Sequence, residues 1–218
     1  MTRGAASGGK GKPRKRKVCV VGFQKTGTTS MDVALGRLGY DVGEAWSVIN
    51  KALRKMDPDD PQVDEVVTRL AVKQLKRHDA IQDSPCPFVF EAFDRAFPGS
   101  KFILTTRPVE AWLESVRDYF PDRASPLRRW MYGAETLRGA EDRLAEVYLR
   151  QNQRIRDYFA DRPADLLELD LGQGGGWYEL VEFLGPDMLP PFPKSNARSG
   201  RLGPEARAVM KRLWAALP

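Results

Sequence analysis

Residues Val18–Ser30 read VCVVGFQKTGTTS, an apolar run followed by a glycine-containing loop. The ordinary phosphate-binding loop of nucleotide triphosphatases, G-x-x-x-x-G-K-[ST], has a lysine directly after its second glycine. Here Gly22 and Gly27 keep the glycine spacing, but Thr28 stands where that lysine belongs. The lysine of this loop lies further upstream, at Lys25.

A loop of this kind still binds a phosphate without that lysine. Its backbone N–H groups and the N-terminus of the following helix attract anions. Thr29 keeps the hydroxyl position of the ordinary motif. The feature that is missing is a cation aimed at a β,γ-phosphate pair. The loop therefore points away from ATP hydrolysis and towards a nucleotide with a different terminal group.

Length and composition fit one α/β domain. The chain has 218 residues, of which 42% are hydrophobic, enough for a sizeable core. The formal net charge is +6, but residues 1–17 are basic and lack any acidic residue, so the remainder is close to neutral. We expect a disordered basic tail over 1–17 and a single domain over 18–218. Because the charge excess is confined to the tail, a nucleic-acid partner is not indicated.

Other compositional signals favour a cytoplasmic protein. No segment approaches the roughly 18 apolar residues of a membrane span, and the basic N-terminus lacks the apolar region of a secretory signal. Cys19 and Cys86 do not make a disulfide framework, so we expect free thiols. With His78 as the single histidine and no Cys/His cluster, a structural zinc site is not expected.

Hydrophobic periodicity predicts alternating strands and helices. Strands are expected over 17–23, 79–83, 101–107 and 165–171, with a short one over 39–42. Helices are expected over 28–38, 47–56, 61–77, 88–97, 140–160, 177–184 and 204–216, with a further one after Pro108. This order predicts a three-layer αβα fold with a parallel sheet of about five strands. Ligands of such folds bind at the carboxyl ends of the strands.

Three further segments accompany the loop. Residues 97–116 read FPGSKFILTTRPVEAWLESV, which places Arg107 at a strand end and Ser115 eight residues later, about two turns into the next helix. Arg107 alone would equally suit a surface ion pair. Residues 170–185 contain Gly-Trp and Phe-Leu-Gly steps, and residues 191–196 read PFPKSN.

In type and order, these segments and the loop sequence KTGTTS resemble the sulfotransferases that use 3′-phosphoadenosine-5′-phosphosulfate (PAPS). The similarity is greatest to the branch with an FPGxKFILTxR segment, and it extends from about residue 18 to 196. The resemblance implies a P-loop NTPase-like α/β fold. It also implies transfer of a sulfuryl group from PAPS to a hydroxyl or amine of a small-molecule or carbohydrate acceptor. The product nucleotide would be 3′,5′-adenosine bisphosphate, and no metal would be needed.

The resemblance assigns roles to individual residues. Lys25 would contact the bridging oxygen and stabilise charge on the leaving phosphate. Arg107 and Ser115 match the pair that holds the 3′-phosphate, since a guanidinium binds phosphate oxygens bidentately. Arg198 lies in a loop similar to the family's nucleotide-closing segment. The residues expected to wrap the 5′-phosphosulfate are Gln24, Lys25, Thr26, Gly27, Thr28, Thr29 and Ser30.

The proton acceptor is expected at the end of the strand that precedes the Arg107 strand. Many family members have a histidine or glutamate there, whereas this strand ends in Asp83, our candidate base. His78 lies at the other end of the same strand. The pocket for the molecule that accepts the sulfuryl group would come from residues 44–62, 84–96 and 119–136. Its aromatic residues, some of which would belong to the core, are Trp46, Phe88, Phe90, Tyr119, Phe120, Trp130 and Tyr132.

Two alternatives fit parts of the same sequence. A P-loop kinase or NTPase with a deviant loop would require magnesium and a phosphate-binding lysine after Gly27. A non-catalytic nucleotide-binding module would keep the fold and use the basic tail as its working part.

Overall fold

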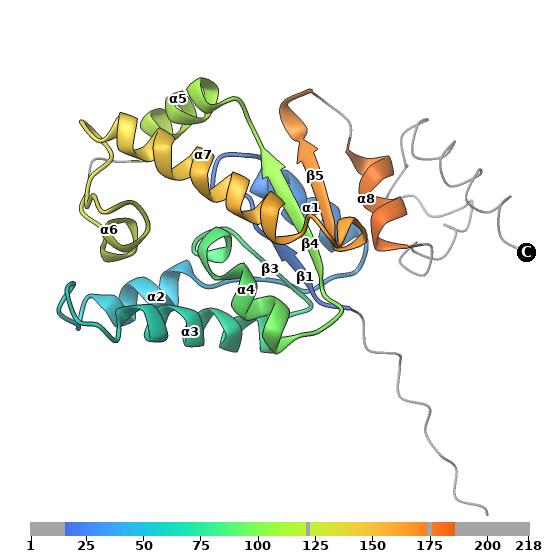
Figure 1. Ribbon diagram of the computed structural model, residues 1–218, viewed down its shortest axis with the longest axis horizontal. Helices are drawn as coiled ribbons and strands as arrows, with labels where there is room; N and C mark the ends of the chain where they lie inside the picture. Colours follow the sequence, from blue (N-terminus) through green and yellow to red (C-terminus); the bar gives the residue numbers. More distant parts are fainter. Residues whose placement is uncertain (1–15, 121–122, 174–175, 186–218) are drawn as a thin grey trace, which may run out of the picture.

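A twisted parallel sheet forms the centre of the protein, with helices on both of its faces (Figure 1). This computed structural model describes residues 16–120, 123–173 and 176–185. Most of the predicted basic tail, the helix predicted over 204–216 and Arg198 lie outside these ranges. The five strands have the order β2-β3-β1-β4-β5 and all pair in parallel, which confirms the predicted fold class. They are β1 (Val18–Val20), β2 (Val42–Glu44), β3 (Ala80–Gln82), β4 (Lys101–Thr106) and β5 (Leu166–Asp170).

The predicted helices inside the described ranges are all present. They are α1 (Thr28–Arg37), α2 (Trp46–Leu53), α3 (Val63–Arg77), α4 (Cys86–Ala96), α5 (Val109–Tyr119), α7 (Glu141–Tyr158) and α8 (Trp177–Leu184). Short 3-10 turns η1 (Pro163–Asp165) and η2 (Leu171–Gln173) flank β5. Pro108 is the N-cap of α5 rather than part of its first turn.

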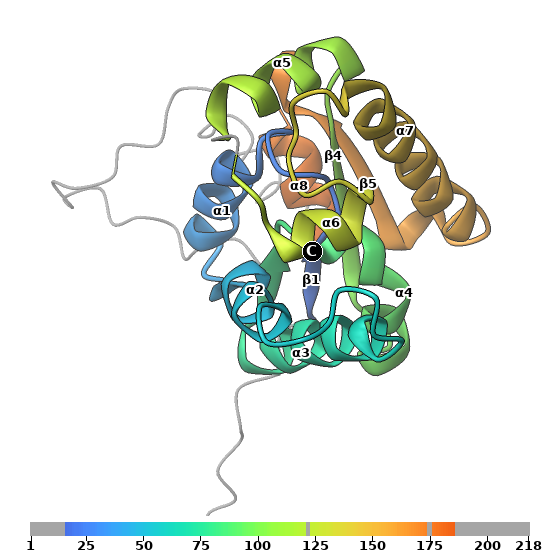
Figure 2. The ribbon, with the colours of Figure 1, turned by 90° about the vertical axis from the view of Figure 1, so that its left-hand side faces the viewer.

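Two details of the prediction were wrong. The second strand lies at Val42–Glu44, not over 39–42, because Gly39 adopts a left-handed turn and pairing with β3 begins at Val42. A further helix, α6 (Pro126–Tyr132), was not predicted. At seven residues it spans too few turns for a periodic pattern, although the hydroxyl of Ser125 caps its N-terminus. In Figure 2, α6 lies between α2 and α7.

Alternate residues of the strands supply two separate cores. Cys19, Phe102 and Leu104 point to the face covered by α2 to α7. Val20 and Ile103 point to the opposite face, where α1 and α8 pack. Burial on both faces explains why these strands are continuous apolar runs in the sequence. The sheet is therefore a rigid platform for the loops at its edge.

Cys19 and Cys86 are free thiols, as predicted, and both are buried. Burial raises the pKa of both thiols, which disfavours the reactive thiolate form. None of the helices in the described ranges is long and apolar enough to cross a membrane.

Candidate active site

The carboxyl ends of three neighbouring strands bring the predicted site residues to one edge of the sheet. The loop of residues 21–27 follows β1, Asp83 follows β3, and Arg107 follows β4. Since β3 and β4 lie on either side of β1, Asp83 and Arg107 flank the loop. This edge is where ligands bind in open α/β sheets.

A cavity of about 640 Å³ opens at this edge. Of the predicted site residues, those that line it are Gln24, Lys25, Gly27, Thr28, Thr29, Asp83, Arg107 and Ser115. Thr26 and Ser30 do not. Ser115 reaches the cavity from α5, two turns beyond Arg107, as the spacing predicted.

The two glycines of the loop are required by close contacts. A Cβ atom on Gly22 would lie 2.0 Å from Oγ1 and 2.4 Å from the carbonyl oxygen of Thr105, in β4. Gly27 has φ of 109°, a left-handed conformation, and its Cβ would lie 2.7 Å from Leu171. Gly22 therefore lets the loop leave the sheet beside β4, and Gly27 lets it turn into α1.

The N-terminus of α1 is open towards the cavity. Gly27 is its N-cap, no side chain caps the first turn, and that turn contains no acidic residue. Thr28 and Thr29 of this turn line the cavity. Their backbone N–H groups have no acceptor within the helix, and the helix dipole adds positive potential at this end. This geometry suits a phosphate or sulfate group.

Thr26 holds the loop rather than facing the cavity. Its hydroxyl donates to the carbonyl oxygen of Phe23 at 2.6 Å and lies 2.6 Å from Oγ1 of Thr105. Its backbone N–H donates to the same carbonyl of Phe23, at 3.3 Å. With both groups occupied, Thr26 fixes the turn, and the phosphate contact expected for it has no support in this arrangement.

Gln24 connects the loop to two other elements. Its Nε2 donates to Oη of Tyr132 at 2.6 Å, and its Oε1 accepts a hydrogen bond from Oγ of Ser84 at 3.1 Å. Its carbonyl oxygen accepts from Nε1 of Trp112 at 2.9 Å. These bonds join the loop to α6, to the end of β3 and to α5. Sequence reasoning missed this network, because its partners lie 60 or more residues away.

Lys25 and Arg107 are cations available to a ligand. Nζ of Lys25 lies 3.6 Å from the centroid of the Tyr119 ring, and Nη1 of Arg107 donates to the carbonyl oxygen of Lys25 at 3.4 Å. Among the described residues, neither has a carboxylate within 4.0 Å. The reading of Arg107 as a surface ion pair is therefore not supported.

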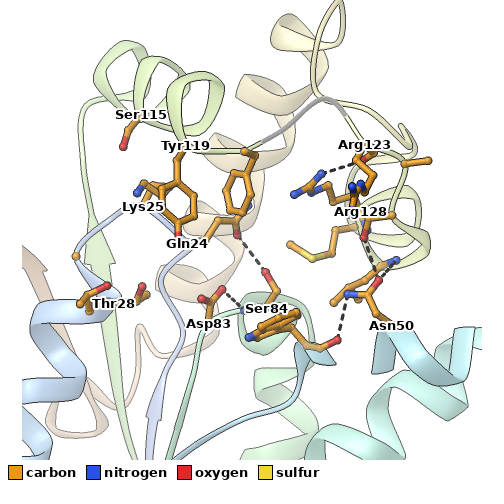
Figure 3. Close-up of a pocket in the computed structure, with 18 of the residues that line it drawn as sticks. Gln24, Lys25, Thr28, Asn50, Asp83, Ser84, Ser115, Tyr119, Arg123 and Arg128 are labelled. Atoms are coloured by element: carbon orange, nitrogen blue, oxygen red, sulfur yellow. Dashed lines mark hydrogen bonds between the residues drawn. The ribbon is translucent and has the colours of Figure 1, made fainter. Parts of the chain in front are cut away.

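Asp83 faces the same cavity (Figure 3). The backbone N–H of Ser84 donates to its Oδ1 at 2.6 Å. Burial raises the pKa of the Asp83 carboxyl, more than the hydrogen bonds from Ser84 and the charge of Lys25 lower it. A carboxylate with a raised pKa accepts a proton more readily than an exposed aspartate.

The other wall of the cavity is less aromatic than predicted. Trp46, Tyr119 and Phe120 line it, whereas the other four predicted aromatic residues do not. Those four, which pack into the core, are Phe88, Phe90, Trp130 and Tyr132. Instead, three arginines that the sequence did not single out complete the wall: Arg54, Arg123 and Arg128.

His78 is remote from this site, as expected. It lies before β3, at the amino end of the strand, and its Nδ1 is 2.9 Å from Oδ2 of Asp41. Across the described ranges, no three His, Cys, Asp or Glu residues are grouped as a metal site requires.

A family model described as "Sulfotransferase domain" matches residues 17–200. Among solved structures, the chain is similar to a sulfotransferase from Alicyclobacillus acidocaldarius, with 17% sequence identity and a TM-score of 0.43. That match covers 92% of each chain. No curated protein matches the chain.

Proposed function

The chain belongs to the sulfotransferase family, and we propose that it transfers a sulfuryl group from PAPS to a hydroxyl or amine. One observation carries the proposal. Lys25 and Arg107, without carboxylate partners among the described residues, line one cavity together with Asp83 and the open N-terminus of α1. Such a cavity has cations and N–H groups for a polyanionic donor and a carboxylate for the acceptor's proton.

The donor end fits a phosphosulfate group. When bound, PAPS supplies a sulfuryl group activated by its anhydride bond to the 5′-phosphate. The N–H groups of Thr28 and Thr29 bind the phosphate oxygens. Lys25, whose Nζ lies over the Tyr119 ring, would stabilise the negative charge that develops on the leaving phosphate. Charge stabilisation by groups already in place is the larger part of catalysis in such transfers.

Arg107 and Ser115 select the 3′-phosphate. The backbone of Arg107 is held at both of its polar atoms, because Oη of Tyr148 accepts from its N–H at 3.0 Å and donates to its carbonyl oxygen at 2.8 Å. The guanidinium therefore extends from a fixed base and can bind two phosphate oxygens at once. A 3′-phosphate distinguishes PAPS from ATP-like nucleotides, so this pair gives the site its donor specificity.

Asp83 accepts the proton of the nucleophile. The acceptor oxygen or nitrogen forms a bond to sulfur, the bond between sulfur and the bridging oxygen breaks, and the proton moves to the Asp83 carboxylate. The N–H of Ser84 fixes Oδ1 of this carboxylate. Because Ser84 also donates to Gln24 of the loop, the base and the donor loop are held in one hydrogen-bond network.

Thermal stabilisation by nucleotides tests this proposal. In EDTA, 3′,5′-adenosine bisphosphate at 100 times its Kd should stabilise the protein by about 2.7 kcal/mol, a rise of several degrees in Tm. The same concentration of 5′-AMP, which lacks the 3′-phosphate, should have a much smaller effect. Equal stabilisation by the two nucleotides, or a requirement for Mg²⁺, would contradict the assignment.

A further inference from the structure

The cavity carries more positive charge than the proposed donor site uses. Among the described residues that line it, Asp83 is the one carboxylate, against five cationic side chains. The donor site uses Lys25 and Arg107. The remaining three are Arg54, Arg123 and Arg128.

Two of these arginines, Arg123 and Arg128, lie at the end of the cavity away from the phosphate loop. In Figure 3, Lys25 and Thr28 are at one side and Arg123 and Arg128 at the other. Asp83 lies between the two groups. A molecule bound at the arginine end would therefore meet Asp83 on the side opposite to the donor.

Arg128 lacks a negative partner although it is half-buried. Its Nη1 donates to the carbonyl oxygen of Arg123 at 3.0 Å, and its guanidinium lies 4.6 Å from the centroid of the Phe120 ring. No carboxylate of the described residues lies within 4.0 Å. Burial lowers the pKa of this guanidinium, and the group that partly offsets this effect is Tyr132 rather than a carboxylate. Removing a cation from water without a counter-charge is unfavourable, so this position is complementary to an anion.

Arg129, the next residue of α6, differs from Arg128 in having two carboxylate partners. Nη2 of Arg129 lies 2.9 Å from Oδ1 of Asp59, and its Nη1 lies 3.0 Å from Oε1 of Glu135. Arg129 is not among the residues that line the cavity. On the same helix, the arginine outside the cavity is thus neutralised by two carboxylates, while Arg128 is not.

Asn50 holds the arginine-bearing segments together. Its Oδ1 accepts hydrogen bonds from Oγ of Ser125 at 3.0 Å and from the N–H of Leu127 at 3.3 Å. These bonds attach the start of α6 to α2. Arg54, four residues after Asn50 at the C-terminus of α2, lies on the same side of that helix. Neither Arg54 nor Arg123 has a carboxylate partner in the described ranges.

We propose that the acceptor is an anionic small molecule whose carboxylate, sulfate or phosphate group binds to Arg54, Arg123 and Arg128. Its hydroxyl or amine then reaches Asp83, and the faces of Trp46 and Phe120 contact its apolar part. This inference rests on the proposed function, because it names the substrate class of the same site.

A matched pair of probes tests the charge requirement. Calorimetric titrations of 4-hydroxyphenylacetate and of its neutral analogue 4-hydroxyphenylacetamide would be made on protein saturated with 3′,5′-adenosine bisphosphate. The carboxylate should bind at least about 10-fold more tightly than the amide, as expected for charge-assisted hydrogen bonds. In R128Q this ratio should fall below about threefold. In the control R129Q, on the same helix but outside the cavity, the ratio should be retained.

The same samples separate this inference from the proposed function. Binding of the bisphosphate alone reports on the donor site, and it should be equal in wild type, R128Q and R129Q. Loss of bisphosphate binding in R128Q would overturn the inference, because the arginines would then belong to the donor site. It would equally be overturned if the carboxylate bound no better than the amide, including the case in which neither binds. Failure of the wild type to bind bisphosphate would instead contradict the proposed function.

Discussion

Lys25 and Asp83 share the left-handed backbone conformation, with φ angles of 68° and 66°, and no other non-glycine residue of the described ranges has a positive φ. They follow neighbouring strands and face the same cavity. For a residue with a side chain, this conformation costs about 1–2 kcal/mol. Backbone strain at the two proposed catalytic positions is consistent with a site in which the backbone conformation directs the Lys25 and Asp83 side chains into the cavity.

A pair of substitutions at Asp83 tests whether this strain is real. Asp83→Ala and Asp83→Gly both remove the carboxyl group, but only glycine adopts a positive φ without steric cost. We expect the glycine variant to have the higher Tm, by about 2–4 °C for each kcal/mol of strain relieved. An alanine variant as stable as the glycine variant, measured by thermal unfolding, would show that the backbone is not strained there.

Asp83→Asn tests the role of the carboxylate in catalysis. Asparagine tolerates the left-handed conformation and keeps the size of the side chain, so the fold should be unaffected. We expect a loss of at least about 10²-fold in turnover, with the affinity for 3′,5′-adenosine bisphosphate changed by less than about twofold. Normal turnover of this variant would remove Asp83 from the mechanism.

The raised pKa of Asp83 predicts the pH dependence of activity. The proposed base works when ionised, so kcat/KM should increase as the pH rises through the pKa of the Asp83 carboxyl in the folded protein. The midpoint of this increase, the acidic limb of the pH profile, should lie above the pKa of about 3.9 of an unperturbed aspartate. Because the folded state holds this proton more tightly than the unfolded state, the Asp83 contribution to stability decreases as pH rises through the same window.

Profiles of kcat/KM and Tm against pH check both statements. Asp83→Asn should lose this pH dependence of Tm, and its residual activity should lack the limb. An acidic limb at or below the unperturbed aspartate value would contradict the assignment.

Alanine substitutions at Gly22 and Gly36 form a matched pair that tests the geometry of the loop. A methyl group on Gly22 would overlap with Thr105, whereas one on Gly36, in α1, would meet nothing within 4 Å. Gly22→Ala should therefore destabilise the protein by about 1–3 kcal/mol, and Gly36→Ala should stabilise it by up to about 1 kcal/mol. Chemical denaturation measures both, and a Gly22→Ala variant of wild-type stability would exclude the close approach of the loop to β4.

Those parts of the structure that depend on local pattern could be predicted from the sequence. The strands of residues 18–20 and 101–106 are apolar runs because both faces of the sheet are covered. Once the strands alternated with helices, parallel pairing placed Lys25, Asp83 and Arg107 at one edge.

Features that depend on distant pairing could not be predicted. The bond between Gln24 and Tyr132 joins residues 108 positions apart. Whether an arginine of the segment 123–129 faces the cavity or a carboxylate depends on how α6 packs against α2. The sequence therefore gave no sign that Arg128 and Arg129 differ, or that Thr26 turns inward.

The most direct test of the central claim is a calorimetric titration with 3′,5′-adenosine bisphosphate and, separately, with ATP and Mg²⁺. The account predicts that the wild type binds the bisphosphate without metal and more tightly than ATP with Mg²⁺. Arg107→Ala should weaken bisphosphate binding by at least about 10-fold, because a charge-assisted contact to the 3′-phosphate is lost. Preference for ATP with Mg²⁺, or unchanged bisphosphate binding by Arg107→Ala, would contradict the account.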